Sequence, residues 1–259
     1  MEQTQAYDEK LVTLLEVLWG PGYLSPGGDE ETDRVLAGID LAGRHVLDIG
    51  SGTGGCAFHI ARRHGPARVI GIDVEAGVVA EAVRRAEEAG LADRVDFRAV
   101  APGPLPFAES SLDVAFSKDS IVHIEDKHGI AAEIFRVLKP GGVFAASDWM
   151  AGADGPMSEA MLRYNELEGL GFRLASPDRY FAALRAAGFV EIAYTDRTAW
   201  YRDLTHKELA ALRGPLHGEL VRRVGQDFLD HEIEVWEALA KVLDTGELGP
   251  GHFRARKPG

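Results

Sequence analysis

The first half of the chain alternates short apolar runs with amphipathic segments of helical period. The apolar runs are bounded by turn residues and predict strands, whereas the segments between them predict helices. The expected strands are residues 45–50, 68–73, 94–101, 112–117 and 143–149, and the expected helices are residues 54–65, 76–90 and 127–139. This alternation is typical of βαβ units that share a parallel sheet.

The second half departs from that rhythm. An amphipathic helix is expected over residues 157–170, outside the alternating series. A helix over residues 176–188 restores the series, because Ser176 is placed as N-cap before Pro177 at the first helical position. The remaining expected elements are a strand over residues 189–195, a helical stretch from about Thr205 to Leu243, and a last strand over residues 251–257.

These elements together predict an α/β fold. We expect a doubly wound, Rossmann-like, seven-stranded sheet with an N-terminal helical lid and helical cap insertions. The expected division is a lid over residues 1–40, a ligand-binding core over residues 41–150, and cap helices with the last strands over residues 151–259.

Composition narrows the class of protein. With 259 residues, 46% of them hydrophobic, the chain can bury a full core. A formal net charge of −13 disfavours nucleic acid as a partner, because a phosphate backbone would be repelled. The single Cys56 excludes an intrachain disulfide and a cysteine-based zinc site. No signal sequence or apolar membrane span is evident, so the expectation is a cytoplasmic protein, monomeric or homodimeric, with a small-molecule partner and no membrane contact.

The segment "VLDIGSGTGG" (residues 46–55) is the most informative stretch. Gly50, Gly52 and Gly54 follow an apolar strand and open a helix. Glycines are needed where the chain turns tightly and a ligand lies against bare backbone. Their spacing also satisfies the dinucleotide fingerprint through Gly55, so the glycines alone leave the ligand open.

Two acids narrow the choice of ligand. Asp73 ends the second strand about 20 residues on, where a carboxylate binds ribose hydroxyls. Asp48 lies inside the first strand, where it would be a poor neighbour for a pyrophosphate but suits a ligand with an ammonium group. S-adenosylmethionine has a ribose, an ammonium and no phosphate, so these residues point to it.

At this point the chain resembles the class I S-adenosylmethionine-dependent methyltransferases. The matching segments are "VLDIGSGTGG", "GIDVE", "LPFAESSLDVAFS" and "RVLKPGGVF", in the family's order, over about residues 40–150. The resemblance implies that Asp48 and Gly50 bind the methionine end and Asp73 the ribose, with Val74 beside it. Ala101 and Pro102 stand where the family usually has an acid for the adenine amine.

Ionisable residues crowd the segment "FSKDSIVHI" (residues 116–124). Ser117, Lys118, Asp119 and His123 follow the fourth strand. Ligands of open parallel sheets bind beyond the carboxyl ends of the strands, so this crowding marks the rim of a site. His123 is the candidate general base, because its ordinary pKa lets it exchange a proton near neutral pH.

A closer resemblance is to the phosphoethanolamine N-methyltransferase group. It rests on "WGPGYLSPGG", "FSKDSIVHIEDK", "SDW", the tail "HFRARK", and an upstream Tyr7 on an expected amphipathic helix. It implies that Tyr7 and His123 form a catalytic latch over the donor and that Asp119 contacts the substrate amine. It also implies a set of further contacts, with Ser25, Ser117 and Lys118 at the cofactor and Tyr23 near the substrate.

The chain departs from this group where the substrate should bind. Trp149 and Phe172 replace tyrosines, while Leu239 and Leu170 stand in place of a lysine and an arginine. A phosphate dianion needs such donors, so we expect a more apolar or unphosphorylated amine as substrate. Candidates for an aromatic wall that attracts methylated ammonium groups are Trp149, Phe172, Trp200 and Tyr201. Core packing explains Phe172 equally well and Trp200 better.

Three alternatives stay open. The acceptor atom could be an oxygen, sulfur or carbon of a small natural product rather than a nitrogen. The glycine turn could serve a nicotinamide-dependent dehydrogenase, or the protein could bind an adenosyl ligand without catalysis. The chain's histidines show no spacing with carboxylates that is typical of zinc or iron ligands, so we expect no metal.

Overall fold

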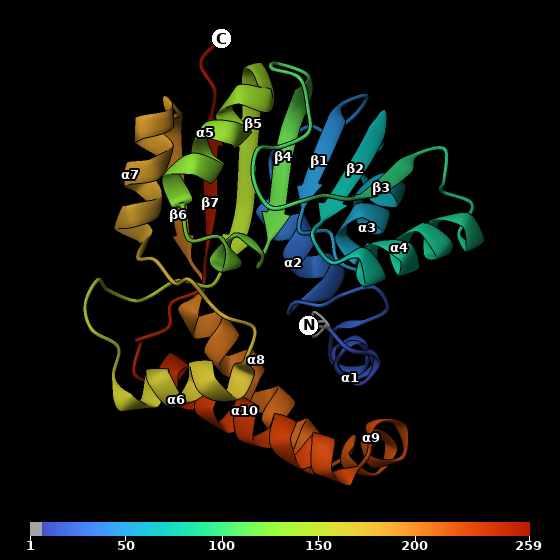
Figure 1. The fold of residues 1–259 in the computed structure, drawn as a ribbon, viewed down its shortest axis with the longest axis vertical. Helices are drawn as coiled ribbons and strands as arrows, with labels where there is room; N and C mark the ends of the chain where they lie inside the picture. Colours follow the sequence, from blue (N-terminus) through green and yellow to red (C-terminus); the bar gives the residue numbers. More distant parts are fainter. Residues whose placement is uncertain (1–6) are drawn as a thin grey trace.

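Seven strands form one sheet at the centre of the molecule (Figure 1). The computed structural model describes residues 7–259. The strands are β1 (His45–Ile49), β2 (Arg68–Asp73), β3 (Val95–Ala99), β4 (Leu112–Lys118), β5 (Leu138–Asp148), β6 (Val190–Asp196) and β7 (Gly251–Arg256). Their order across the sheet is β3-β2-β1-β4-β5-β7-β6, and every neighbouring pair is parallel except the two that involve β7. The prediction of a doubly wound, Rossmann-like fold is confirmed.

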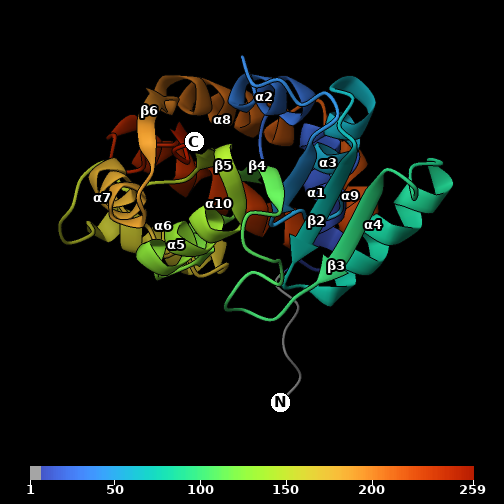
Figure 2. The same ribbon diagram turned by 90° about the horizontal axis from the view of Figure 1, so that it is seen from above.

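The helices that cover the sheet lie on both of its faces (Figure 2). On one face are α2 (Gly28–Val35), α3 (Gly55–Arg63) and α4 (Ala76–Glu88), and on the other are α5 (Lys127–Val137) and α7 (Pro177–Ala187). Apolar residues alternate along β1, so that Val46 packs against the first group and Leu47 against the second. Burial on both faces explains the apolar runs within the central strands β1, β2, β4 and β5.

A separate layer of helices lies below the sheet in Figure 1, at the carboxyl ends of the parallel strands. It consists of α1 (Glu9–Trp19), α6 (Glu159–Glu168), α8 (Thr198–Arg213), α9 (His217–Val224) and α10 (Gln226–Asp244). These helices share an apolar core of their own, which includes Trp149 directly after β5. The layer therefore closes the carboxyl end of the sheet. The strand order reverses between β1 and β4, which is the usual place for a ligand in such folds.

Three expectations about local structure are wrong. The helical stretch begins at Thr198 rather than near Thr205, and it is divided at Gly214 and Gly225 into three helices. The helix expected over residues 127–139 already ends at Val137, and the Pro-Gly-Gly segment that follows bulges within β5 instead of stopping the helix. Tyr7 precedes α1, whose N-cap is Asp8, instead of lying on that helix.

Within residues 7–259, none of the helices combines the length and the apolar composition needed to cross a membrane.

Candidate active site

Two adjoining cavities open at the carboxyl end of the sheet. The larger has a volume of about 780 Å³ and lies over β1, β2 and β4. The smaller has a volume of about 100 Å³ and lies between that end of the sheet and the helical layer. Six residues line both cavities and mark their junction: Tyr7, Leu24, Ser25, Asp119, His123 and Leu170.

The glycine turn forms one wall of the larger cavity. Gly50 has φ +74°, and a Cβ there would fall 2.0 Å from Ser120 Oγ, so only glycine fits. Gly52 has φ +51° and also lines the cavity. Gly54 does not line it; this residue begins α3 in the left-handed region and packs against Phe58. Gly54 therefore shapes the turn but does not face the larger cavity.

Asp48 and Asp73 both line the larger cavity, but their environments differ. Asp73 accepts hydrogen bonds from the backbone N–H of Gly52 at 2.9 Å and of Glu75 at 3.0 Å, and so braces the turn. Asp48 is 1% exposed, and its Oδ2 has no hydrogen-bond partner within residues 7–259. Burial, reinforced by the nearby charge of Asp73, raises the pKa of Asp48 to about 7.

The tip of β4 supplies the polar floor of the junction. Lys118 donates to Ser25 Oγ at 2.6 Å and to the Pro26 carbonyl at 2.7 Å, and its Nζ lies 3.5 Å from Asp119 Oδ2. Asp119 has φ +54°, a strained value for a residue with a Cβ, which turns its carboxylate into the junction. Ser117 is fully buried and donates to the Ile49 carbonyl at 3.0 Å, so it joins β4 to β1 and lines neither cavity.

His123 stands on a short 3-10 helix, η1 (Ile121–His123), that follows β4. Buried polar groups fix this helix: Asp148 accepts from the Val122 N–H at 3.1 Å, and Lys127 donates to the Ile121 carbonyl at 2.8 Å. The imidazole packs against Phe172, with ring centroids 5.3 Å apart. Burial lowers the pKa of His123 below its ordinary value, so the ring is neutral at physiological pH.

Tyr7 reaches the junction from the segment before α1. Burial, together with the carboxylates of Glu168 and Asp73, raises the pKa of its hydroxyl well above the ordinary value. The phenol therefore stays protonated and can donate a hydrogen bond, but it is not a base. Tyr7 and His123 line the same space, and no hydrogen bond joins them among the contacts of the described residues.

Comparison with known proteins agrees with this geometry. Residues 46–142 match a family described as "Methyltransferase domain". The chain is 34% identical over 203 residues to O-methyltransferase resE of Aspergillus sclerotiorum, an alignment that covers 73% of this chain and 76% of that protein. The chain belongs to the class I S-adenosylmethionine-dependent methyltransferases.

Other similar methyltransferases are longer than this chain. Phosphoethanolamine N-methyltransferase 1 of Triticum aestivum is 33% identical over 243 residues, which are 93% of this chain and 47% of the wheat protein. This class I methyltransferase thus spans about half the length of that relative. The solved structure of Haemonchus contortus phosphoethanolamine N-methyltransferase 2, with phosphomonomethylethanolamine and S-adenosylhomocysteine, has a TM-score of 0.91 at 25% identity and covers 99% of this chain and 59% of that one.

The residues of the larger cavity fit the donor of a class I methyltransferase. The bare backbone at Gly50 lets a ligand lie where a side chain would otherwise stand. The unpaired oxygen of Asp48 suits an ammonium group, and Val74, Ala101 and Pro102 offer apolar contact at the same cavity. Tyr23 was expected near the substrate, but it lines the larger cavity only, where its hydroxyl donates to Asp29.

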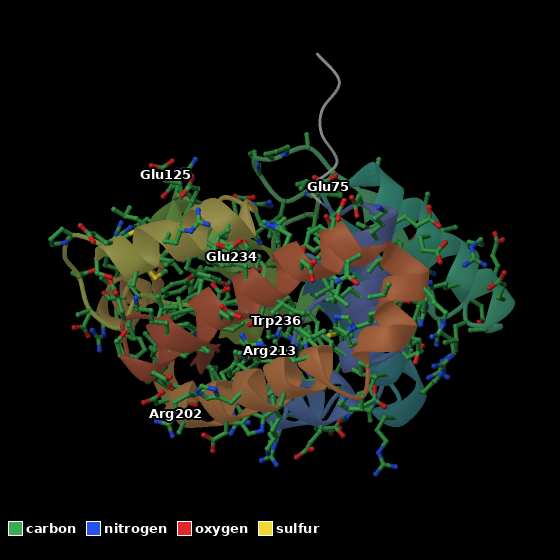
Figure 3. All side chains as sticks on the ribbon, turned by 90° about the horizontal axis from the view of Figure 1, so that it is seen from below. Glu75, Glu125, Arg202, Arg213, Glu234 and Trp236 are labelled. Carbon is green, nitrogen blue, oxygen red and sulfur yellow. The ribbon has the colours of Figure 1, made fainter. Side chains whose placement is uncertain are left out.

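Aromatic side chains dominate the smaller cavity of this methyltransferase. Trp149 and Phe172 of the expected aromatic wall line it, whereas Trp200 and Tyr201 do not. Tyr164, Trp19 and Trp236 join from the helical layer. The indole N–H groups of Trp19 and Trp236 both donate to Glu208 of α8, at 2.6 and 3.0 Å. Figure 3 shows Trp236 between α10 and α8. Trp236 thus belongs to the core of the helical layer and to the cavity wall at once.

Sequence reasoning missed three acids of the smaller cavity: Glu168, Glu208 and Glu232. They stand on α6, α8 and α10, and each alternates with solvent-facing charges that look the same in sequence. A weak signal existed, because Glu232 lies four residues before Trp236 and therefore on the apolar face of α10. Only the packing of three helices shows that the acids converge.

Two histidines and a carboxylate meet in the tertiary structure although no metal-ligand spacing joins them in the sequence. Nε2 of His59 and Nε2 of His64 each lie 2.7 Å from Oδ1 of Asp33, between α2 and α3. Asp33 is 26 residues before His59, beyond any local ligand spacing. The group lines neither cavity.

Proposed function

We propose that this protein transfers a methyl group from S-adenosylmethionine to the nitrogen of a small amine. The observation that carries the proposal is the position of His123 and Asp119 at the junction of the two cavities. A donor in the larger cavity and an acceptor in the smaller one would meet beside both residues. The sequence family and the similarity to phosphoethanolamine N-methyltransferases support the same assignment.

The proposed roles follow from the chemistry of each side chain. When bound, S-adenosylmethionine supplies a methyl group on a sulfonium that is already activated for in-line displacement. Asp48 pairs with the donor's ammonium, and Asp73 binds its ribose. Lys118 and Ser25 line the part of the cavity proposed to hold the methyl group. Asp119 holds the acceptor amine, and neutral His123 takes its proton so that a lone pair is free to attack.

Tyr7 is proposed to close the site over the two substrates. Its hydroxyl stays protonated and can donate to His123 or to the acceptor once both cavities are filled. Alignment and exclusion of water are then the main contributions of the protein, since the donor is already reactive.

The proposal is tested by calorimetry and a screen of acceptors. Calorimetry should show binding of S-adenosylhomocysteine and S-adenosylmethionine, and none of NAD. A methyl-transfer screen over small amines, phosphobases and amino acids should then yield an N-methylated product. Binding of NAD, or binding of the adenosyl ligands without any methyl transfer, would contradict the proposal.

A second candidate function is O-methylation of a small natural product. It is favoured by the similarity to O-methyltransferase resE and by the 35% identity over 189 residues to erythromycin 3''-O-methyltransferase. A hydroxyl is a weaker acid than an ammonium, so it stays protonated at high pH, where an amine loses its proton to the solvent. In His123→Ala, methylation should therefore recover at high pH for an amine acceptor but not for a hydroxyl acceptor. Hydroxyl acceptors in the same screen distinguish the two candidates.

Asp73→Ala is expected to weaken the binding of S-adenosylhomocysteine about tenfold, through the loss of ribose hydrogen bonds. The same carboxylate braces Gly52 and Glu75, so thermal unfolding of the variant must be measured alongside. Titration calorimetry gives the dissociation constant, and Asp96→Ala, a carboxylate of β3 that lines neither cavity, is the control. An unchanged dissociation constant in Asp73→Ala would show that the donor does not lie over β2.

A further inference from the structure

The smaller cavity is lined by more carboxylates than an acceptor with a single reacting nitrogen would need. Four carboxylates line it, namely Asp119, Glu168, Glu208 and Glu232. Among residues 7–259, neither lysine nor arginine lines it. An anionic acceptor such as a phosphomonoester would meet four carboxylates and no cation there, an arrangement opposite to that of phosphate sites.

Each of the four carboxylates has different partners. Asp119 accepts from Ser147 at 3.0 Å and lies near Lys118, and both oxygens of Glu208 accept indole N–H groups. Glu168 accepts one bond, from the Leu170 N–H at 2.9 Å. Glu232 is 7% exposed and lines the cavity, yet it makes neither a hydrogen bond nor an ion pair within residues 7–259.

An ionised carboxylate that is buried without a partner is costly, and the cost is relieved either by protonation or by a cation. Burial raises the pKa of each carboxyl to about 7, with a further contribution from the charge of Glu232 at Glu168 and from the charge of Asp8 at Glu232. The reacting nitrogen cannot serve as their counter-ion, because it must be neutral when it attacks the donor methyl. The cation must therefore be a second group on the acceptor.

The surrounding aromatic rings fit the same ligand. Tyr164, Trp236 and Phe172 line the cavity together with Glu168 and Glu232. Aromatic faces attract an ammonium group through the ring quadrupole, most strongly where water is excluded. The small volume of the cavity limits the acceptor to a short chain.

Building on the function proposed above, we infer that the methyl acceptor is a short aliphatic diamine. One nitrogen faces the donor at the junction beside Asp119 and His123. The other stays an ammonium and binds Glu232 and Glu168 inside the aromatic wall of the smaller cavity.

The test compares matched acceptors with the whole protein and S-adenosylmethionine. The probes are 1,3-diaminopropane and 1,4-diaminobutane, against n-butylamine, ethanolamine and phosphoethanolamine. The diamines should exceed n-butylamine in kcat/KM by about 30-fold or more, the size expected when a buried charge gains its partner. Glu232→Gln should remove most of this preference by raising KM for the diamines, with little effect on n-butylamine or on S-adenosylhomocysteine affinity.

Glu234→Gln is the matched control, because Glu234 is exposed on the same helix, pairs with Arg163, and is labelled in Figure 3. It should leave the preference unchanged. Glu168→Gln gives the same measurement from α6, in case Glu232→Gln does not fold.

The outcomes separate this inference from the proposed function. If the kcat/KM for monoamines or phosphoethanolamine equals that for the diamines, the inference is wrong and the N-methyltransferase proposal stands. If nothing is methylated, the proposed function fails and the diamine is no methyl acceptor, and calorimetry of 1,4-diaminobutane with the S-adenosylhomocysteine-loaded protein then decides only whether the cation site exists. Binding that Glu232→Gln abolishes supports the cation site, and absence of binding overturns it.

Discussion

His123→Ala is expected to lower the turnover number about a hundredfold or more, because the amine loses the base that removes its proton. His123 touches the junction of the two cavities and is held there by a short helix whose backbone binds Asp148 and Lys127. The affinity for S-adenosylhomocysteine should change little, since the donor contacts lie mainly on β1 and β2. Steady-state kinetics and titration calorimetry measure the two quantities separately.

The pH profile gives an independent readout of the same residue. Burial lowers the pKa of His123, so the neutral, proton-accepting ring should persist below pH 6.5. Activity of the native protein should then rise with pH on an acid limb whose midpoint lies below 6.5, and this limb should vanish in His123→Ala. His128→Ala, an exposed histidine on α5, is the control. Unaltered turnover in His123→Ala would assign proton removal to another group.

Asp48→Asn is expected to weaken donor binding about a hundredfold, as when one partner of a buried charge pair is removed. Asp48 is 1% exposed, and its Oδ2 is unpaired within residues 7–259, so the ligand's ammonium is the partner it suits. Asparagine keeps the shape of the side chain and removes the charge. Calorimetry with S-adenosylhomocysteine measures the loss, and Asp93→Asn, an exposed carboxylate, is the control.

The raised pKa of Asp48 also predicts how donor binding depends on pH. Burial raises the pKa of its carboxyl to about 7, so much of it is protonated just below neutral pH before the donor binds. A cationic ligand favours the ionised form, so binding near pH 6.5 should release protons, and affinity should fall as pH drops below 7. Calorimetry in two buffers of different ionisation enthalpy detects the release. If no protons are released and the affinity of Asp48→Asn is native, the ammonium lies elsewhere.

The fold could be predicted from local patterns along the chain. The central strands β1, β2 and β4 contain short apolar runs, because both faces of the sheet are covered, and each is followed by a helix that packs on the sheet. The glycine turn, Asp48 and Asp73 are close in sequence or at fixed offsets from a strand end. These residues therefore line one cavity because the parallel topology places the carboxyl ends of β1 and β2 side by side.

The helical layer was predicted less well. Thr198 begins α8 seven residues before the expected start near Thr205, and Asp196 accepts hydrogen bonds from its N–H and its hydroxyl. Tyr7 lies before the helix that its sequence pattern suggested, since Asp8 accepts from the Leu11 N–H and fixes the N-terminus after it. Such ends depend on single hydrogen bonds rather than on periodicity.

The sequence by itself determined the order of strands and helices, the family, and the residues at the tips of β1, β2 and β4. It could do so because strand ends are local features and a parallel sheet brings them to one edge. Only the tertiary structure decided that Glu168, Glu208 and Glu232 share one aromatic cavity, and that Gly54 and Ser117 face away from the site. Three helices far apart in sequence meet there, and which of their acids are buried depends on packing that no single helix records.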